Sequence, residues 1–177
     1  MLRPFGVDDI DAMLAYRGRA DVCRYLPFEP QDAADLLQRL AGDYGRVALT
    51  AEGQSLTLGA WSRATGELLG DVILFFRSQV HRGGEIGWVF DPAHAGRGYA
   101  TEAATAVLAL GFARPEAGGL GLHRVEARLD ARNDRSAALC ERLGMRREAH
   151  FVRNEWFKGE WGDLLVYAVL AEEFSRS

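Results

Sequence analysis

The segment that decides the fold is Gly96-Arg97-Gly98-Tyr99-Ala100-Thr101, which joins a strand-like run to an alanine-rich helical run. The strand-like run is Glu85 to Phe90, and the helical run is Tyr99 to Phe112. Glycines let the backbone approach a ligand closely, and the first N–H groups of a helix have no partner inside the helix. Arg97 and the helix macrodipole add positive charge at the same end. The segment therefore predicts a cradle for an anion, a diphosphate above all.

Two other phosphate-binding motifs fit this segment less well. A Walker loop ends in Gly-Lys-Ser or Gly-Lys-Thr, whereas Tyr99 follows Gly98 here, so a kinase or ATPase is excluded. A dinucleotide fingerprint needs Gly or Ala at the position of Thr101, within a strand-helix-strand unit near the start of a domain. The strands before the segment read as a meander instead. A hydride-transfer enzyme that binds NAD is therefore only a third alternative.

Length and composition describe one globular domain, residues 1–177. The chain is 48% hydrophobic and 26% charged, which allows a sizeable core, and its net charge of −4 disfavours nucleic-acid binding. Cys23 and Cys140 lie far apart and no secretory signal is apparent, which favours the cytoplasm. The longest apolar runs, Val72 to Phe76 and Leu164 to Ala171, are far short of the roughly 20 residues of a membrane span. No membrane segment is expected.

The sequence contains no motif that is typical of a metal site or of a serine hydrolase. The histidines are isolated from one another and form no ligand set: His81, His94, His123 and His150. No Gly-x-Ser-x-Gly elbow is present for a serine nucleophile. We therefore predict neither a structural nor a catalytic metal.

Hydrophobic periodicity predicts an α+β fold. The expected helices are Val7 to Arg19, Gln31 to Ala41, Tyr99 to Phe112 and Ser136 to Leu143. The expected strands are Val47 to Thr50, Leu56 to Arg63, Leu68 to Phe76, Glu85 to Phe90 and Arg124 to Asp130, followed by a hairpin of Met145 to Glu155 and Leu164 to Leu170. A crossover helix should make the fourth and fifth strands parallel. The prediction is a twisted mixed sheet of about seven strands, mostly antiparallel with one central parallel pair, flanked by about four helices.

Two ordered motifs resemble those of a known family. Phe90-Asp91-Pro92-Ala93-His94-Ala95-Gly96-Arg97-Gly98-Tyr99-Ala100-Thr101-Glu102-Ala103 resembles the acetyl-CoA segment of the Gcn5-related N-acetyltransferases (GNAT). Asn133-Asp134-Arg135-Ser136-Ala137-Ala138-Leu139-Cys140-Glu141-Arg142-Leu143-Gly144-Met145 is similar to the family's second motif. Leu2 to Phe5 and Arg24 to Phe28 are typical of the ribosomal-protein N-terminal acetyltransferase (RimJ/RimL-like) branch. The resemblance covers nearly the whole chain and implies the GNAT fold.

The resemblance implies acetyl-CoA as co-substrate and a set of contacts to it. Backbone groups of Val89, Phe90 and Asp91 would bind the pantetheine arm. The pyrophosphate would be held by the N–H groups of Gly96, Arg97, Gly98, Tyr99, Ala100 and Thr101. The side chain of Asn133 would contact the pantetheine or diphosphate arm, with a role as helix cap alone as the alternative. Ala95 departs from the Gln or Arg that the family often carries, which leaves the backbone cradle untouched.

The catalytic side chains are less well defined than the coenzyme site. Glu85 stands where related histone-type members carry a carboxylate base, and the alternative is a solvated glutamate at a strand end. Cys140 occupies the position of the tyrosine that protonates the leaving thiolate in many relatives, and the alternative, which we favour, is a small core residue. Ser136 is expected to serve the local structure of its helix rather than catalysis.

Residues of two segments are candidates for the acceptor side. Arg24, Tyr25 and Phe28 belong to the loop between the first two expected helices. Trp156 belongs, with Phe157 and Trp161, to an aromatic cluster in the expected final hairpin. In the branch that the chain resembles, this hairpin lies near the acceptor groove or a homodimer contact. A covered hydrophobic edge is the alternative.

The sequence thus predicts an acetyl-CoA-dependent N-acetyltransferase that works by direct transfer in a ternary complex. The acceptor is a primary amine, either a protein N-terminus or a small molecule, and the sequence does not choose between them. The alternative from another class is a non-catalytic acyl-CoA-binding sensor or scaffold, since the usual tyrosine is replaced by Cys140.

Overall fold

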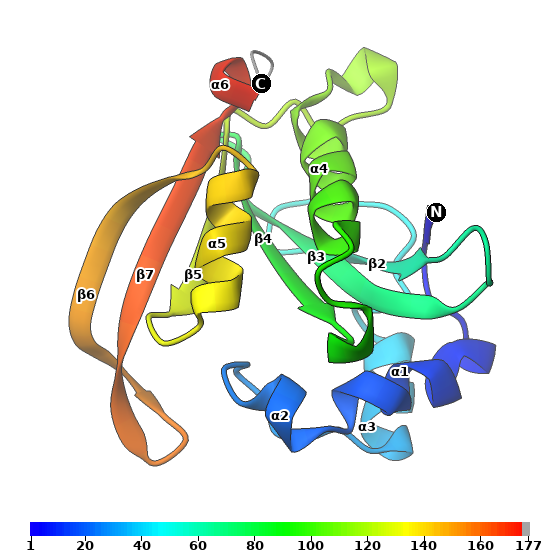
Figure 1. Ribbon diagram of the computed structural model, residues 1–177. Coiled ribbons are helices and arrows are strands. Elements are labelled where there is room, and N and C mark those ends of the chain that lie inside the picture. The colour runs from blue at the N-terminus through cyan, green and yellow to red at the C-terminus, as the bar shows by residue number, and fades with distance from the viewer. Residues whose placement is uncertain (175–177) are drawn as a thin grey trace.

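The computed structural model describes residues 1–174 and places seven strands in one mixed sheet (Figure 1). The strand order is β1-β2-β3-β4-β5-β7-β6. Neighbouring strands are antiparallel except β4 and β5, which are parallel. The predicted mixed sheet with one central parallel pair is therefore confirmed.

The strands follow the chain in an order that explains this topology. They are β1 (Leu2–Arg3), β2 (Ser55–Trp61), β3 (Leu68–Ser78), β4 (Gly83–Phe90), β5 (Arg124–Asp130), β6 (Arg146–Phe157) and β7 (Glu160–Leu170). The helix α4 (Tyr99–Phe112) connects β4 to β5. A parallel neighbour requires a crossover of this kind, whereas the antiparallel pairs β2-β3, β3-β4 and β6-β7 need only turns.

Helices cover both faces of the sheet. α4 and α5 (Asp134–Arg142) lie side by side on one face (Figure 1). On the other side are α1 (Ile10–Arg17), α2 (Ala20–Cys23) and α3 (Ala33–Ala41), and α6 (Ala171–Phe174) follows β7. Short 3-10 helices cover Val7–Asp9, Pro92–His94 and Pro115–Ala117. Residues 1–174 thus contain six α-helices where about four were predicted, and the two additional ones have four residues each.

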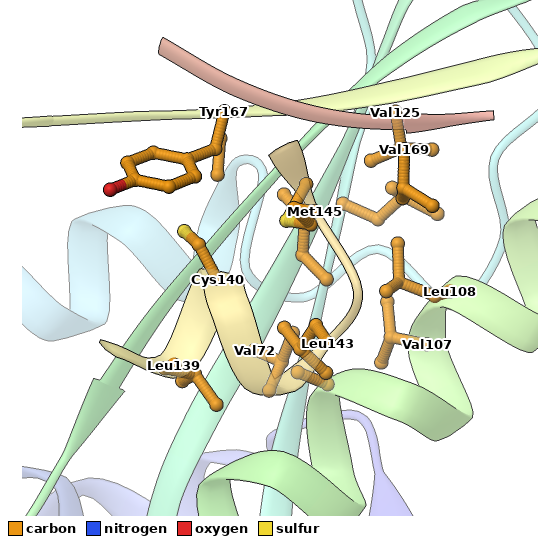
Figure 2. Close-up of a cluster of buried hydrophobic side chains, with 14 of the residues drawn as sticks. Val72, Val107, Leu108, Val125, Leu139, Cys140, Leu143, Met145, Tyr167 and Val169 are labelled. Atoms are coloured by element: carbon orange, nitrogen blue, oxygen red, sulfur yellow. The ribbon is translucent and has the colours of Figure 1, made fainter. Parts of the chain in front are cut away.

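Alternation along the strands divides the core into two clusters. Val72 and Leu74 of β3 belong to the cluster under α4 and α5, while Ile73 packs with the cluster under α1 and α3. Figure 2 shows the larger cluster, in which the side chains of α4 and α5 meet those of β5 and β7. A strand that is apolar on both faces is expected where both faces are covered.

One predicted strand is wrong. Val47 to Thr50 has irregular backbone, and the edge of the sheet beside β2 is formed by Leu2 and Arg3, which pair with Ala60 and Gly59. A short β-prone run becomes a strand only where an unpaired edge is available to it, and the N-terminal residues occupy that edge.

Two negative findings hold for residues 1–174. No helix in this range combines the length and the apolar character that crossing a bilayer requires. In the same range, no group of three or more His, Cys, Asp or Glu side chains is arranged to hold a metal ion.

Candidate active site

The central parallel strands separate halfway along their length. β4 and β5 pair at Gly83 with Arg124, Gly84 with Val125 and Glu85 with Glu126, and not beyond. Both strands nevertheless continue, β4 to Phe90 and β5 to Asp130. Residues of the two separated ends line a cavity of 870 Å³. Backbone groups along such a gap have no strand to bond with, so they are available to a ligand.

The register of β3 shows which backbone groups face the gap. The N–H of Asp91 donates to the carbonyl oxygen of Leu69 at 3.0 Å, and its own carbonyl oxygen accepts from the N–H of His94 at 3.0 Å. Because bonding direction alternates along an antiparallel strand, Val89 also bonds toward β3, whereas Trp88 and Phe90 point their N–H and C=O groups toward β5. The backbone groups of Val89 and Asp91 therefore point away from the gap, and their expected contacts with pantetheine stay predictions. The backbone groups of Phe90 point into the gap, as do those of Trp88, which the sequence analysis did not include among the candidates.

The glycine-rich turn before α4 is open to solvent. Gly96 and Gly98 have φ values of +77° and +80°, a conformation that favours glycine, and a Cβ on either would meet no atom within 4 Å. Gly98 precedes the first residue of α4 and its position carries no side-chain cap. The first-turn N–H groups of Tyr99, Ala100 and Thr101 therefore face a site that packed side chains do not close. This geometry fits the predicted diphosphate cradle.

A further cation lies beside the cradle. Arg142, in the last turn of α5, donates from Nε to Thr101 Oγ1 at 3.3 Å. Its guanidinium is exposed and thus able to meet an anion held by α4. Sequence reasoning missed it, although its position in the second motif, nine residues after Asn133, was the available signal.

Asn133 is placed at the cavity by its role as a cap. Its Oδ1 accepts from the N–H of Ser136 at 3.1 Å and so begins α5, and the residue also lines the cavity. The structure thus shows the capping role that the sequence predicted. A contact of its amide NH2 with the coenzyme stays a prediction.

Glu85 lies where β4 and β5 begin to separate. Its side chain is on the face of α1 and α3, lines the cavity and is 18% exposed. Arg77 on β3 donates from Nε to its Oε2 at 2.9 Å. A carboxylate at the entry to the gap is suitably placed to accept a proton from an amine that approaches from this face.

Cys140 and Ser136 occupy different surroundings on α5. The side chain of Cys140 is fully buried, and Figure 2 shows it among core residues such as Leu139, Leu143 and Tyr167. Burial raises the pKa of this thiol to about 12. Ser136 instead lines the cavity, where its Oγ accepts from Trp88 Nε1 at 3.1 Å. The hydroxyl in the cavity is therefore better placed to give up a proton there than the thiol in the core.

A buried polar network forms the floor of the cavity on the side of α1 and α3. Arg17 donates to Asp71 through Nε at 3.1 Å and Nη2 at 2.7 Å, and through Nη1 to Gln31 and Tyr44 at 3.0 Å each. The Tyr16 hydroxyl donates to Asp71 at 2.5 Å, and burial followed by the nearby Asp71 carboxylate raises the pKa of Tyr16. The sequence analysis did not identify this network, although Asp71, a charged residue inside the apolar run Leu68 to Phe76, indicated a buried charge.

The candidates for the acceptor side do not all reach the cavity. Tyr25 and Phe28 line it, whereas Arg24 does not and instead stacks on Tyr25, with 5.1 Å between its guanidinium carbon and the ring centre. Trp156 lines a second, smaller hollow together with Phe28, and it packs edge-on against Trp161. The structure therefore joins the final hairpin to the loop after α2, and it places Trp156 beside the main cavity rather than in it.

Comparison with known proteins identifies the family of the chain. Residues 1–146 match the family model for an acetyltransferase (GNAT) domain. The chain is 32% identical over 178 residues to the Bacillus subtilis protein called uncharacterized N-acetyltransferase YnaD. This alignment covers 99% of the chain and 95% of the relative. The chain is also 23% identical over 177 residues to spermidine N(1)-acetyltransferase of Escherichia coli. This alignment covers 98% of the chain and 87% of the relative. The crystal structure of a GNAT-family acetyltransferase from Bacillus anthracis superposes on the chain with a TM-score of 0.83 at 31% sequence identity. The superposition covers 97% of this chain and 95% of the other. The chain therefore belongs to the GNAT acetyltransferase family and is an acetyl-CoA-dependent N-acetyltransferase.

Proposed function

We propose that this enzyme transfers the acetyl group of acetyl-CoA directly to the primary amine of a small molecule, within a ternary complex. The observation that supports the proposal is the separation of β4 from β5 beside the open turn of α4. In our proposal, the pantetheine arm of a coenzyme held at that turn runs along the unpaired backbone of Trp88 and Phe90. Its thioester would then end in the cavity that Glu85 and Ser136 line.

The reaction requires a neutral amine, a nearby thioester carbonyl and a proton for the departing thiolate. In our proposal Glu85 accepts the proton of the attacking amine, directly or through a water. The indole N–H of Trp88 donates to Ser136 Oγ and leaves the hydroxyl proton of Ser136 free to bond the thiolate. Ser136 passes this proton to the thiolate and regains one from water, so that no alkoxide remains. We do not assign this step to Cys140, because its thiol lies in the core. The N–H groups of the first turn of α4, with Arg142, hold the diphosphate, and Asn133 remains a candidate contact to the pantetheine arm.

The acceptor side favours a small aliphatic amine. The cavity lining carries five carboxylates and four guanidiniums, with aromatic rings among them: Glu29, Asp35, Asp43, Asp71 and Glu85, then Arg17, Arg39, Arg77 and Arg128, and the rings of Tyr25 and Phe28. The carboxylates, which outnumber the guanidiniums by one, attract an ammonium ion, whereas the rings of Tyr25 and Phe28 already face guanidinium groups. Among the relatives, the Escherichia coli enzyme acts on spermidine, which agrees with a polyamine-like acceptor. A protein N-terminus, the acceptor of the branch that the sequence resembles, is the second candidate.

A thiol-release assay with a panel of amines tests the proposal. The panel contains spermidine, spermine, free amino acids, an aminoglycoside and short peptides with free N-termini. Both cysteines of the chain are fully buried, so a thiol reagent should see released coenzyme A with little background from the protein. We expect turnover with a small amine and a higher kcat/KM for it than for any peptide. A preference for peptides would overturn the acceptor class.

The same assay separates the enzyme from a sensor. Calorimetry with acetyl-CoA reports binding independently of turnover. Binding without thiol release for any amine or peptide would favour the non-catalytic alternative. No binding at all would contradict the cradle itself.

A further inference from the structure

The loop that walls the acceptor side is tied to the far half of the sheet by one side chain. Lys158 is the single lysine among the 21 Lys and Arg residues of the chain. It lies at the tip of the hairpin of β6 and β7 and contacts residues 23–29, about 130 positions earlier in the sequence. In Figure 1 this tip reaches the level of α2, below the gap between β4 and β5.

The contacts of this ammonium are specific. Nζ donates to the carbonyl oxygen of Cys23 at 2.7 Å and to that of Phe28 at 3.0 Å, and it lies 3.6 Å from Glu29 Oε1. The side chain is 25% exposed, so water competes only partly for these bonds. An ammonium has three donors and no acceptor, and here it has three oxygen neighbours. The two carbonyls lie on either side of residues 24–27, so one side chain holds both ends of that segment.

The turn itself does not require a lysine. β6 ends at Phe157 and β7 begins at Glu160, which leaves a two-residue connection of Lys158 and Gly159 with φ values of +47° and +87°. Such turns prefer Asn or Gly first, because a positive φ strains most other residues. Lysine at this position costs the turn some stability, and its contacts with the loop offset that cost.

A second contact ties the same loop to the same half of the sheet. Arg132, which follows β5, stacks on Tyr25 with 5.7 Å between the guanidinium carbon and the ring centre. Its guanidinium is fixed by Asp130, at 2.8 and 2.6 Å, and by Glu160 of β7. Tyr25 and Phe28 both line the cavity, so the loop bridges the two halves of the sheet while forming the acceptor wall.

We infer that Lys158 is a positioning residue for the amine acceptor: it fixes the loop of residues 24–29 and thereby sets the shape of the acceptor wall without touching the reacting atoms. The inference rests on the proposed function. The coenzyme cradle lies on α4 and takes no contact from Lys158 in residues 1–174, so the two substrates should respond differently when this tie is cut.

The test compares four variants of the full chain. Lys158→Met keeps the apolar stem and removes the donors, whereas Lys158→Arg keeps the charge. Glu29→Gln removes the ion pair and leaves both carbonyl contacts, and it is followed by hydrogen exchange alone because Glu29 also belongs to the acceptor wall. Arg153→Met is the matched control, since Arg153 is an exposed cation with φ of +49° on the same hairpin and its side chain has no contact with the loop.

Hydrogen exchange of residues 20–32 and steady-state kinetics with spermidine as the probe amine are the two readouts. For Lys158→Met we expect about tenfold faster exchange in that segment, an approximately tenfold higher KM for spermidine and an unchanged KM for acetyl-CoA. Lys158→Arg should recover part of both effects, Glu29→Gln should show a smaller increase in exchange than Lys158→Met, and Arg153→Met should match the wild type.

Each departure from this pattern has a definite meaning. Unchanged exchange in Lys158→Met would overturn the tie. Faster exchange with unchanged KM for spermidine, or an equal rise in KM for acetyl-CoA, would overturn the role in positioning the acceptor. If the wild type acetylates none of the panel amines, the proposed function fails, and with it the role toward an acceptor, while exchange still decides whether Lys158 holds the loop.

Discussion

Two glycines share a backbone conformation, and substituting each of them distinguishes an effect on ligand binding from an effect on folding. Gly98 has φ of +80° and Gly118 has φ of +79°, and a Cβ on either would meet no protein atom within 4 Å. Gly98 precedes α4 at the cradle, whereas Gly118 ends the 3-10 helix Pro115–Ala117 after α4. Substituting either glycine should therefore cost a similar amount of folding stability. Only at Gly98 would the new side chain enter the space proposed for the diphosphate.

We expect Gly98→Val and Gly118→Val each to lose stability by about 1–2 kcal/mol or somewhat more, because a branched residue is strained at this φ. Only Gly98→Val should lose affinity for coenzyme A, by at least about tenfold, since the new side chain fills the place of the diphosphate. Urea unfolding and calorimetry measure the two effects. Retained affinity in Gly98→Val would contradict the cradle, and lost affinity in Gly118→Val would assign the effect to the fold.

The proton donor for the thiolate is tested by two residues of α5. We expect Ser136→Ala to lower kcat by about 10²-fold, the lower range for a general acid, with little change in the KM for acetyl-CoA. Cys140→Ala should lower the melting temperature and leave kcat nearly unchanged, because it removes a buried atom of the core. Steady-state kinetics and thermal unfolding distinguish the two. A larger fall in kcat for Cys140→Ala would return the role of acid to the thiol.

Among the elements, α1 and β3 are joined by a buried ion pair. The side chains of Arg17 and Asp71 are 2% and 0% exposed. Removing one partner leaves a buried charge without its counterion, so Arg17→Met should lower the free energy of unfolding by about 3–5 kcal/mol. The double variant Arg17→Met/Asp71→Leu should lose less than Arg17→Met alone. Urea unfolding of these two variants and of Asp71→Leu measures the coupling, and a loss in the double variant equal to the sum of the two single losses would show that the two charges act independently.

How far the sequence predicts each element depends on the range of the interactions that form it. The turn and first residues of α4 are predictable, because glycine conformation and helix-end chemistry are local. The separation of β4 from β5 and the outward backbone of Trp88 are not, because both follow from the register of strands distant in sequence. The same holds for Arg17 and Asp71, 54 positions apart, and for the edge that Leu2 and Arg3 take in place of Val47 to Thr50.

At the scale of the whole molecule, two parts of one sheet meet along a narrow seam. Strands β1 to β4 and strands β5 to β7 share three paired positions between β4 and β5. Across the rest of the gap the connections are made by side chains, such as Trp88 with Ser136 on one face and Lys158 with the loop after α2 on the other. Acetyl-CoA, in the proposed position, touches β4, α4 and α5 together and so links the two parts.

Coenzyme binding should therefore stabilise the molecule as a unit. At a concentration 100 times its Kd, a ligand of the native state adds about 2.7 kcal/mol, which for a chain of this size raises Tm by roughly 5–11 °C. Thermal unfolding with and without coenzyme A measures the shift, and Gly98→Val, with its weakened cradle, should show a much smaller one at the same concentration. Hydrogen exchange gives the location: protection should appear in residues 86–90, at the start of α4 and in residues 127–136, which face one another across the gap. Protection confined to one side would mean that the coenzyme does not lie between the separated strands, whatever its affinity, and would contradict the path proposed for its pantetheine arm.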